Sequence, residues 1–402
     1  MNGLVLFDDD AARAFEPFAL TRPVSELRAG TEIVRRRWEV ALDAEAIGFA
    51  GASHLADFDE LDAPHAVTGD IAAGTILVNA RCAPALTPAD PWADVWMCNG
   101  RVAAVRLARP VSVAMLRDGP APIDGFAEAG AASSELAGWW LDNVWDLVRL
   151  LPDMLASDIP HRVERLDTIS AAEAGATVIG AYSTRVERGA SIEPYVVFDA
   201  TTGPVLVRRG TTVAPFSRLV GPVYAGEDSL VGGGRIGTTS IGDHCRVHGE
   251  VNSTVFLGHA NKSHEGFVGH SYLGRWTNLG AGTITSNLKN TYGPVALWSP
   301  GGMRDTGMQF LGTFFGDHAK TAIGTRLTTG GVIGAGANVF DSPMTEKIIA
   351  PFSWGGGPDA PAYELDKFLE VAERVMSRRH MSLSERARRA LSAAYAARWQ
   401  GV

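Results

Sequence analysis

Histidines, asparagines and a lysine gather in one glycine-rich stretch, NKSHEGFVGHSYLGRWTNLGAGTITSNL, which runs from residue 261 to 288. Six of the ten histidines of the chain lie between His244 and His318. Histidine is the usual general base near neutral pH, and side-chain amides can stabilise a developing oxyanion. His264, Asn278 and Asn287 are therefore candidate catalytic residues for acyl transfer to an amine.

Two other roles remain open for these histidines. A histidine in such a stretch is often purely structural, and a ladder of histidines along a β-coil can also bind metal. A zinc site needs a closed set of Cys, His or Asp ligands, and the stretch offers no such set. On the residues alone a structural role is therefore the more common one, and a general base is favoured over a metal ligand.

The residues around the stretch show a six-residue period. Apolar or small residues recur at this step, at Val186, Ile192, Phe198, Val207, Val213, Leu219, Ala225, Val231, Phe267, Leu273, Leu279, Phe315, Thr321, Leu327, Ile333 and Val339. This period is typical of a hexapeptide β-helix, in which each hexad forms one face and about three hexads close one coil. With about eighteen residues per coil, we expect His264, Asn278 and Asn287 on neighbouring coils at one corner.

The period stops between Asn287 and Met308, where Pro294, Trp298 and Pro300 occur. This segment is predicted to be a loop that projects from the coils. Loops on rigid scaffolds are common places for functional sites.

The sequence divides into three predicted domains, at residues 1–172, 173–343 and 344–402. In the first, strands are expected at 3–7, 46–51 and 75–80, and helices at 25–38 and 134–155, which favours an α/β layer with a parallel sheet. The second is the β-helix. The third is predicted to be a helical tail, with a Ser382–Glu385 capping box, that packs on the coils or on a neighbouring subunit.

Composition limits the class of protein. A net charge of −9 over 402 residues gives no support for binding to nucleic acid or a membrane surface. Three widely spaced cysteines do not indicate a disulfide scaffold, and no apolar run is long enough to cross a bilayer. A cytoplasmic, multidomain protein is expected.

The stretch 261–288 resembles the acetyltransferase domain of a bifunctional family, the N-acetylglucosamine-1-phosphate uridylyltransferases/glucosamine-1-phosphate N-acetyltransferases. The segment LTRPVSELRAG at 20–30 resembles the nucleotide-binding region of the same family. The resemblance implies a Rossmann-like nucleotidyltransferase domain, a left-handed parallel β-helix and a homotrimer. It also implies acetyl-CoA bound between neighbouring subunits, with His264 as the base, Asn278 and Asn287 as contacts to the sugar and the acetyl group, and Lys320 as a cofactor contact.

The chain departs from this family at several positions. Asn252 replaces a phosphate-binding lysine and Phe267 a tyrosine, so Lys262 and Lys289 are expected to supply the lost positive charge. No glycine-rich loop follows the first strand, where the sequence is LFDDDAARAF. Arg22 and Arg28 are therefore the expected phosphate ligands, and Asp8 and Asn79 the expected Mg²⁺ ligands.

The sequence thus predicts a sugar-1-phosphate nucleotidyltransferase that uses Mg²⁺ with UTP or dTTP and also N-acetylates an amino sugar phosphate. Three alternatives remain. The first is an acyltransferase with a degenerate N-terminal domain. The second is a nucleotidyltransferase whose β-helix serves only to form the trimer. The third is a non-catalytic sugar-nucleotide-binding scaffold.

Overall fold

The computed structural model describes residues 3–117, 122–341 and 344–399. The chain forms two compact units, one of Met1–Asp146 with Met381–Ala397 and one of Leu147–His380 with Arg398–Val402. We call them the N-terminal unit and the β-helix unit. The predicted boundary at residue 172 lies inside the β-helix unit, because helix α5 (Leu151–Val163) packs against its strands.

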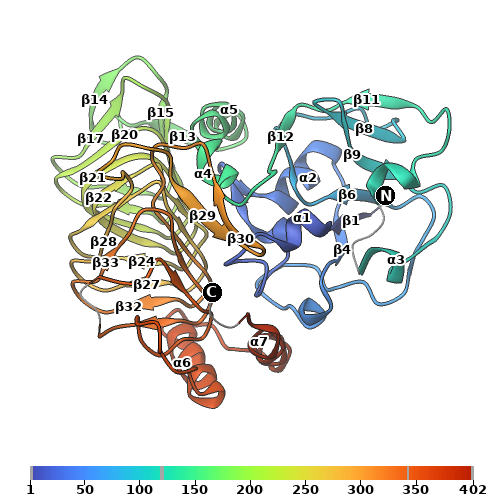
Figure 1. Ribbon diagram of the computed structural model, residues 1–402. Helices are drawn as coiled ribbons and strands as arrows, with labels where there is room; N and C mark the ends of the chain where they lie inside the picture. Colours follow the sequence, from blue (N-terminus) through green and yellow to red (C-terminus); the bar gives the residue numbers. More distant parts are fainter. Residues whose placement is uncertain (1–2, 118–121, 342–343, 400–402) are drawn as a thin grey trace. The chain divides into compact units, whose positions relative to one another are not determined.

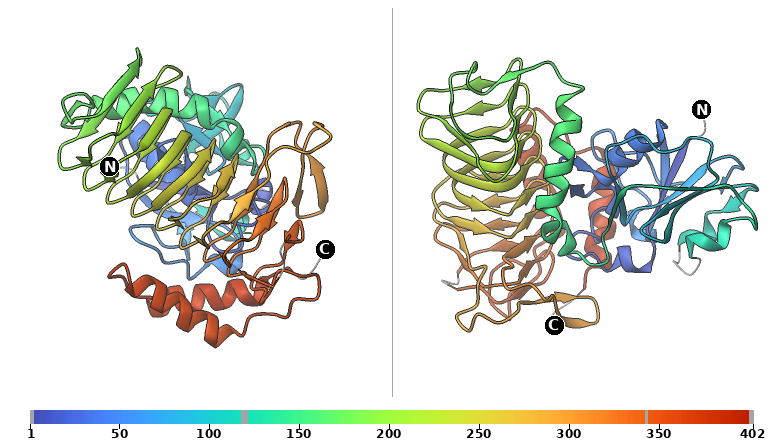
Figure 2. Two further views of the ribbon diagram at one scale, coloured as in Figure 1. Left: turned by 90° about the vertical axis from the view of Figure 1, so that its left-hand side faces the viewer. Right: turned by 90° about the horizontal axis from the view of Figure 1, so that it is seen from above.

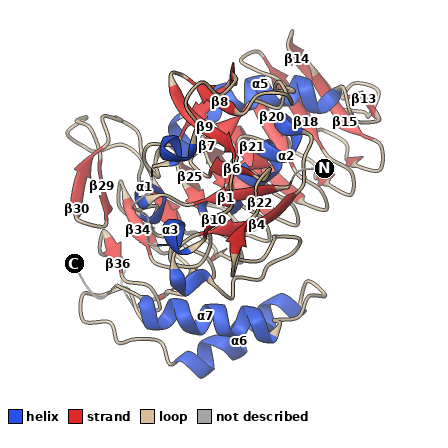
Figure 3. Ribbon diagram, turned by 90° about the vertical axis from the view of Figure 1, so that its right-hand side faces the viewer, coloured by secondary structure: helices blue, strands red, loops and turns tan. Residues whose placement is uncertain are grey.

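A six-stranded sheet forms the core of the N-terminal unit, in the order β11-β8-β9-β6-β1-β4 (Figures 1 and 3). Its strands are β1 (Leu4–Phe7), β4 (Ala46–Ala50), β6 (Ile76–Asn79), β8 (Val95–Cys98), β9 (Arg101–Arg106) and β11 (Ser133–Glu135). β1 pairs in parallel with β4 and β6, and β8 with β11, whereas β9 is antiparallel to both of its neighbours. The sheet is therefore mixed: its β6-β1-β4 part and its β8-β11 pair show the parallel arrangement expected from the sequence, and the antiparallel β9 separates them.

Short elements surround this sheet. They are α1 (Asp10–Arg13), η1 (Val24–Glu26), β2 (Arg28–Ala29), β3 (Glu32–Ile33), α2 (Val34–Leu42), η2 (Ser53–Leu55), β5 (Asp70–Ile71), β7 (Cys82–Pro84), β10 (Val111–Ser112), α3 (Ala114–Arg117), η3 (Ile123–Phe126) and β12 (Gly138–Trp140). The helix predicted over 25–38 begins only at Val34, because Gly30 has a positive φ of 66° and reverses the chain between β2 and β3. The helix predicted over 134–155 is likewise wrong in position, since β11, β12 and α4 (Asp146–Arg149) precede α5.

The β-helix unit is a parallel β-helix with three faces, as the six-residue period predicts, and it is left-handed, as the family resemblance implies (Figure 2). The first face contains β14 (Thr177–Gly180), β17 (Val197–Ala200), β25 (Phe267–Gly269), β28 (Ile284–Thr285) and β33 (Arg326–Leu327). The second contains β15 (Thr184–Glu187), β18 (Val205–Val207), β23 (Val255–Phe256), β26 (Tyr272–Leu273), β31 (Thr313–Phe315), β34 (Gly331–Ile333) and β36 (Ile348–Ile349), with β13 (Thr168–Ser170) antiparallel to β15. The third contains β16 (Ser191–Ile192), β19 (Thr212–Val213), β24 (Asn261–Lys262), β27 (Asn278–Leu279), β32 (Lys320–Thr321) and β35 (Asn338–Val339).

Three longer strands turn corners between these faces, namely β20 (Ser217–Ala225), β21 (Leu230–Ile241) and β22 (Arg246–Asn252). The periodic residues line one continuous core inside the coils, including Val213, Val231, Phe315 and Ile333. Phe267 is an exception: Val268 points inward in its place, and Phe267 lies on the outer side of the first face. This one-residue shift brings an aromatic side chain to the outer side of the first face.

The predicted loop after Asn287 leaves the coils and returns to β31, and it carries the antiparallel hairpin β29 (Ala296–Ser299) and β30 (Gly302–Asp305) (Figure 1). The predicted tail helices are α6 (Leu365–Ser377) and α7 (Glu385–Ala397). Phe368 of α6 packs edge-on against His318 and Phe352 of the last coils. α7 belongs to the N-terminal unit, and its first turn is capped by Ser384, not Ser382, because Ser384 Oγ accepts the Ala387 N–H at 2.9 Å.

Within the described residues, no helix is long and apolar enough to cross a membrane. Cys82, Cys98 and Cys245 are buried free thiols.

Candidate functional site

His264 lies at the corner that joins the third face to the first, between β24 and β25. Its side chain is exposed. One coil earlier, the same corner carries His248, whose Nε2 lies 2.8 Å from Glu265 Oε1. We call this the His264 corner. An exposed imidazole on a rigid coil is placed to exchange a proton with a bound molecule.

Lys262 lies directly behind the His264 corner, inside the coil. It occupies an inward position, in register with Val247, and only 2% of the residue is exposed. Its ammonium donates to the carbonyl oxygen of His248 at 2.9 Å and also to that of His264. Burial lowers the pKa of Lys262 to about 8, and the charge of Glu265 partly opposes this shift. Its position therefore fits a role in holding the corner better than the expected contact to a substrate phosphate.

Asn287 lies at the opposite edge of the first face, where the loop leaves β28. Its Nδ2 is 2.9 Å from Nδ1 of His270, one coil earlier. Burial lowers the pKa of His270 to about 4, so this imidazole is neutral near pH 7 and can accept the amide proton. A Cβ built at Gly269 would lie 2.5 Å from Phe267 Cζ and 2.7 Å from Asn287 Nδ2. Phe267 and Asn287 therefore meet over Gly269.

Asn278 is the first residue of β27, on the third face, and its side chain is exposed. Its Oδ1 accepts a weak hydrogen bond from Asn261 Nδ2 at 3.4 Å. The expectation that His264, Asn278 and Asn287 share one corner is wrong. Residues 17 apart stack on consecutive coils here, as in the pairs Asn261–Asn278 and His270–Asn287, and spacings of fourteen and nine residues do not match that repeat. His264 and Asn287 flank the first face, and Asn278 lies on the third.

The two remaining predicted lysines are bonded to backbone carbonyls. Lys289 Nζ donates to Pro294 O at 2.8 Å within the loop. Lys320 follows Asn278 on the third face, where its Nζ donates to His318 O at 2.9 Å, and burial lowers its pKa to about 8.

In the N-terminal unit, the ends of β1 and β6 lie side by side, because Phe7 pairs with Asn79. Asp8 and Asn79 therefore lie at one edge of the sheet, as expected for adjacent parallel strands. Asp9 accepts two hydrogen bonds of 2.7 Å from the Arg81 guanidinium and one of 2.9 Å from Asn79 Nδ2. Arg81 hydrogen bonding holds the pKa of Asp9 below its usual value, against the opposing effect of burial.

These oxygens do not fit a Mg²⁺ site. Asn79 Oδ1 accepts the Arg81 N–H at 2.8 Å, and both Asp8 oxygens face the Val24 N–H at 3.2 and 3.3 Å. Burial raises the pKa of Asp8 to about 7. Within the described part of the chain, no three His, Cys, Asp or Glu side chains are grouped to hold a metal. The expected metal role of Asp8 and Asn79 is therefore not supported.

Both predicted phosphate-binding arginines are buried and engaged with protein groups. Arg22 forms two hydrogen bonds with Glu60, of 2.8 and 3.2 Å, and Arg28 donates to the carbonyl of Thr31. A triphosphate would have to displace these partners. The sequence could not show this, because Glu60 lies 38 residues from Arg22.

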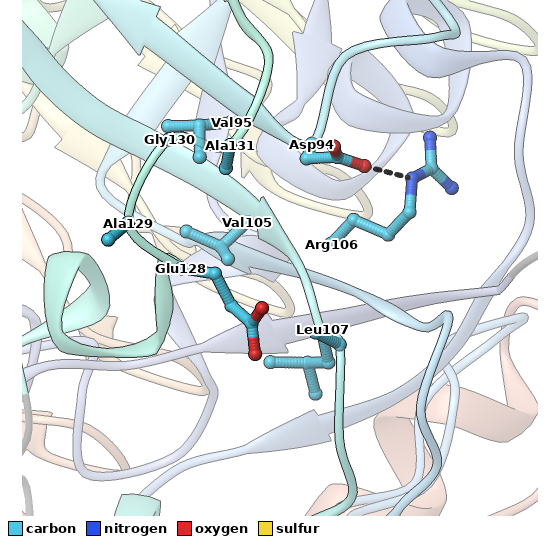
Figure 4. Close-up of a pocket in the computed structure, with 10 residues that line it drawn as sticks. Asp94, Val95, Val105, Arg106, Leu107, Glu128, Ala129, Gly130 and Ala131 are labelled. Carbon is cyan, nitrogen blue, oxygen red and sulfur yellow. Dashed lines mark ion pairs between the residues drawn. The ribbon is translucent and has the colours of Figure 1, made fainter.

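A cavity of about 290 Å³ opens elsewhere in this unit, between β8, β9 and residues 128–131 (Figure 4). Its charged groups include Glu128 and the pair Arg106–Asp94, whose Nε and Oδ1 are 3.5 Å apart. Arg106 pairs with Ile76, so this cavity lies where β6 begins, and Asn79 lies where β6 ends. None of the predicted site residues lines it.

Residues 4–165 match the sugar nucleotidyl transferase family. The chain is 31% identical over 182 residues to the "Bifunctional protein GlmU" of Bartonella quintana, an alignment that covers 43% of this chain and 35% of that protein. It is 29% identical over 100 residues to a "Bifunctional sugar-1-phosphate nucleotidylyltransferase/acetyltransferase" of Sulfurisphaera tokodaii, over 25% of each chain. A solved hexapeptide transferase family protein from Anaplasma phagocytophilum aligns with 56% of this chain and 99% of its own length, at 16% identity and a TM-score of 0.25.

The matched segments span at most about a third of the length of these two bifunctional relatives, 35% and 25%. The relatives are nevertheless named transferases of the kind that the sequence predicts. Over these segments the chain is therefore similar to sugar nucleotidyl transferases, at residues 4–165, and to bifunctional sugar-1-phosphate nucleotidylyltransferase/acetyltransferases.

Proposed function

We propose that the β-helix unit transfers an acetyl group from acetyl-CoA to the amine of an amino sugar phosphate. The observation that carries this proposal is the exposed His264 on a corner whose carbonyl groups are held from inside by Lys262. The names of the relatives support the same chemistry. We further propose that the protein is a homotrimer, the assembly implied by the family resemblance.

In this reaction the amine nitrogen attacks the thioester carbonyl while His264 takes up the proton that the amine loses. The carbon–sulfur bond then breaks, and the thiolate of CoA leaves. We expect the sugar to bind on the first face, between His264 and Asn287. Phe267 lies beside Asn287 there and offers an apolar ring surface, whereas Asn252 offers no positive charge. The acceptor is therefore expected to differ in its phosphate contacts from glucosamine-1-phosphate bound by the standard family.

We also propose nucleotidyl transfer to a sugar 1-phosphate as a second activity, favoured by the family match over residues 4–165. The buried, paired Arg22 and Arg28 speak against binding a triphosphate in the way the sequence predicted. This activity is therefore the less supported of the two.

A product assay by mass spectrometry tests both proposals. The protein would be incubated with glucosamine-1-phosphate, acetyl-CoA, Mg²⁺, UTP and dTTP. Acetylated sugar phosphate alone is the product we expect for the β-helix unit, and a nucleotide-linked sugar would establish the second activity. Absence of any acetylated product, also with other amino sugar phosphates, would contradict the acetyl-transfer proposal.

Replacement of Lys262 by methionine is expected to lower the rate of acetyl transfer about tenfold, because the His264 corner loses its internal support. The free energy of unfolding should change little near pH 7. Methionine fills a similar volume. The variant loses two hydrogen bonds, but it no longer has to bury an ammonium group, and the two effects offset each other. Steady-state rates and urea unfolding measure the two effects. Lys367→Met, at an exposed ion pair on α6, is the control, and an unchanged rate in Lys262→Met would refute the supporting role.

A further inference from the structure

A ladder of polar side chains runs along the third face of the β-helix. Successive coils place Arg246, Asn261, Asn278, Lys320 and Asn338 in register. Neighbouring strands in a sheet lie about 4.8 Å apart, so each side chain is beside the next. The ladder contains no carboxylate and presents hydrogen-bond donors on every coil.

The segment after α6 adds a guanidinium to this ladder. Arg379 Nη2 donates to Asn261 Oδ1 at 2.7 Å, although the two residues are 118 positions apart. The helix before it is fixed to the coils, since Phe368 packs against His318 and Phe352. Arg379 is therefore held over the third face next to Arg246.

Arg246, Arg378 and Arg379 are close enough for their charges to act on one another. Among the residues that the structure describes, no ion pair joins Arg246, Arg378 or Arg379 to a carboxylate. Burial lowers the pKa of Arg379, and the charges of Arg246 and Arg378 lower it further. On earlier coils the arginines are paired: Arg208 with Glu187 and Glu227, Arg209 with Glu227, and Arg218 with Asp199. Like charges gathered without a counter-ion repel one another, so the cluster is suited to an anion.

We propose that Arg246, Asn261 and Arg379 form a binding site for a phosphate group of a small ligand. The planar guanidinium matches a phosphate with two parallel hydrogen bonds. Asn261 links the two arginines, because it is in register with Arg246 and its Oδ1 accepts the hydrogen bond from Arg379. The site lies on the third face, whereas the sugar is expected to bind on the first face. Phosphate binding at this site does not depend on acetyl transfer. The phosphate belongs either to free phosphate or pyrophosphate, or to the phosphorylated end of a nucleotide.

Isothermal titration calorimetry of the full-length protein with pyrophosphate and with adenosine 3′,5′-bisphosphate tests the site. We expect Arg246→Gln and Arg379→Gln each to weaken binding about tenfold, and Arg379→Lys to restore only part of the loss. Arg374→Gln is the matched control, because Arg374 lies on α6, just before the segment that carries Arg379, but pairs with Glu370 at 3.0 Å. It should bind like the unchanged protein.

Tighter binding of the bisphosphate than of pyrophosphate would assign the site to a nucleotide end, and equal binding would assign it to a simple phosphate. Both results support the proposal. Circular dichroism and thermal melting would show that the variants fold. The proposal is overturned if neither probe binds, or if folded Arg246→Gln and Arg379→Gln bind as tightly as Arg374→Gln.

Discussion

Replacing His264 by alanine should lower the rate of acetyl transfer by about a hundred- to ten-thousand-fold, the usual contribution of a general base. The physical reason is that the other imidazole at the His264 corner, that of His248, is engaged through both of its ring nitrogens. His248 is the nearest imidazole on the corner, but its Nδ1 lies 2.8 Å from Gly232 O and its Nε2 2.8 Å from Glu265. The measurement is kcat and KM for the acetyl acceptor found in the product assay.

Stability should hardly respond to this change. His264 is exposed and fills no core space, and surface substitutions usually change stability by less than about 0.5 kcal/mol. His161→Ala, on α5, is the matched control and should keep full activity. A folded His264→Ala protein that acetylates at the original rate would rule out the base assignment and favour a structural role for the stretch 261–288.

The β-helix itself could be predicted from the sequence because its physical rule is local. Every hexad must turn one small or apolar side chain inward, and residues such as Val213, Leu219, Val231 and Ile333 obey that rule. The rule fails at loops and at candidate functional residues. Lys262 takes an inward position that the pattern reserves for an apolar side chain, and only the carbonyls of His248 and His264 make this tolerable.

The candidate sites were harder to predict because they depend on distant partners. The sequence predicts Arg22 as a phosphate ligand, but in the fold Arg22 is hydrogen-bonded to Glu60. Asn261 accepts a hydrogen bond from Arg379, which lies far away in the sequence. A spacing of fourteen residues cannot reveal whether two side chains share a corner unless the length of the coil is known. The sequence therefore singles out the candidate residues of the stretch 261–288, but only the structure shows which of them lie together.

Asp8→Asn is expected to stabilise the protein increasingly as the pH rises, by on the order of 3 kcal/mol more at pH 8 than at pH 5. Asp8 is 4% exposed, and burial raises the pKa of its carboxyl from 3.8 to about 7. The folded state therefore holds this proton to a higher pH than the unfolded state does. The stability from this proton is fully present below about pH 3.8 and is lost as the pH rises to about 7. Asparagine is neutral throughout, so the variant avoids the loss.

Urea unfolding of the unchanged protein and of Asp8→Asn, at pH 5 and at pH 8, measures the difference in their free energies of unfolding. The other carboxylates contribute equally to both proteins, so their effects cancel in this difference. Asp10→Asn, at an exposed position two residues further, should show no such pH dependence. An advantage of Asp8→Asn that is equal at both pH values would contradict the raised pKa.

The same pair of proteins tests whether Asp8 holds Mg²⁺, because a ligand that binds only the folded state raises its stability. A magnesium-bound carboxylate must be ionised, and Mg²⁺ would then stabilise the unchanged protein at pH 8 but not Asp8→Asn. The buried, Val24-bonded carboxyl predicts the opposite, namely equal unfolding curves for each protein with and without Mg²⁺. The high pKa of Asp8 would then reflect burial of its carboxyl group, and any metal used in nucleotidyl transfer would have to bind through other groups.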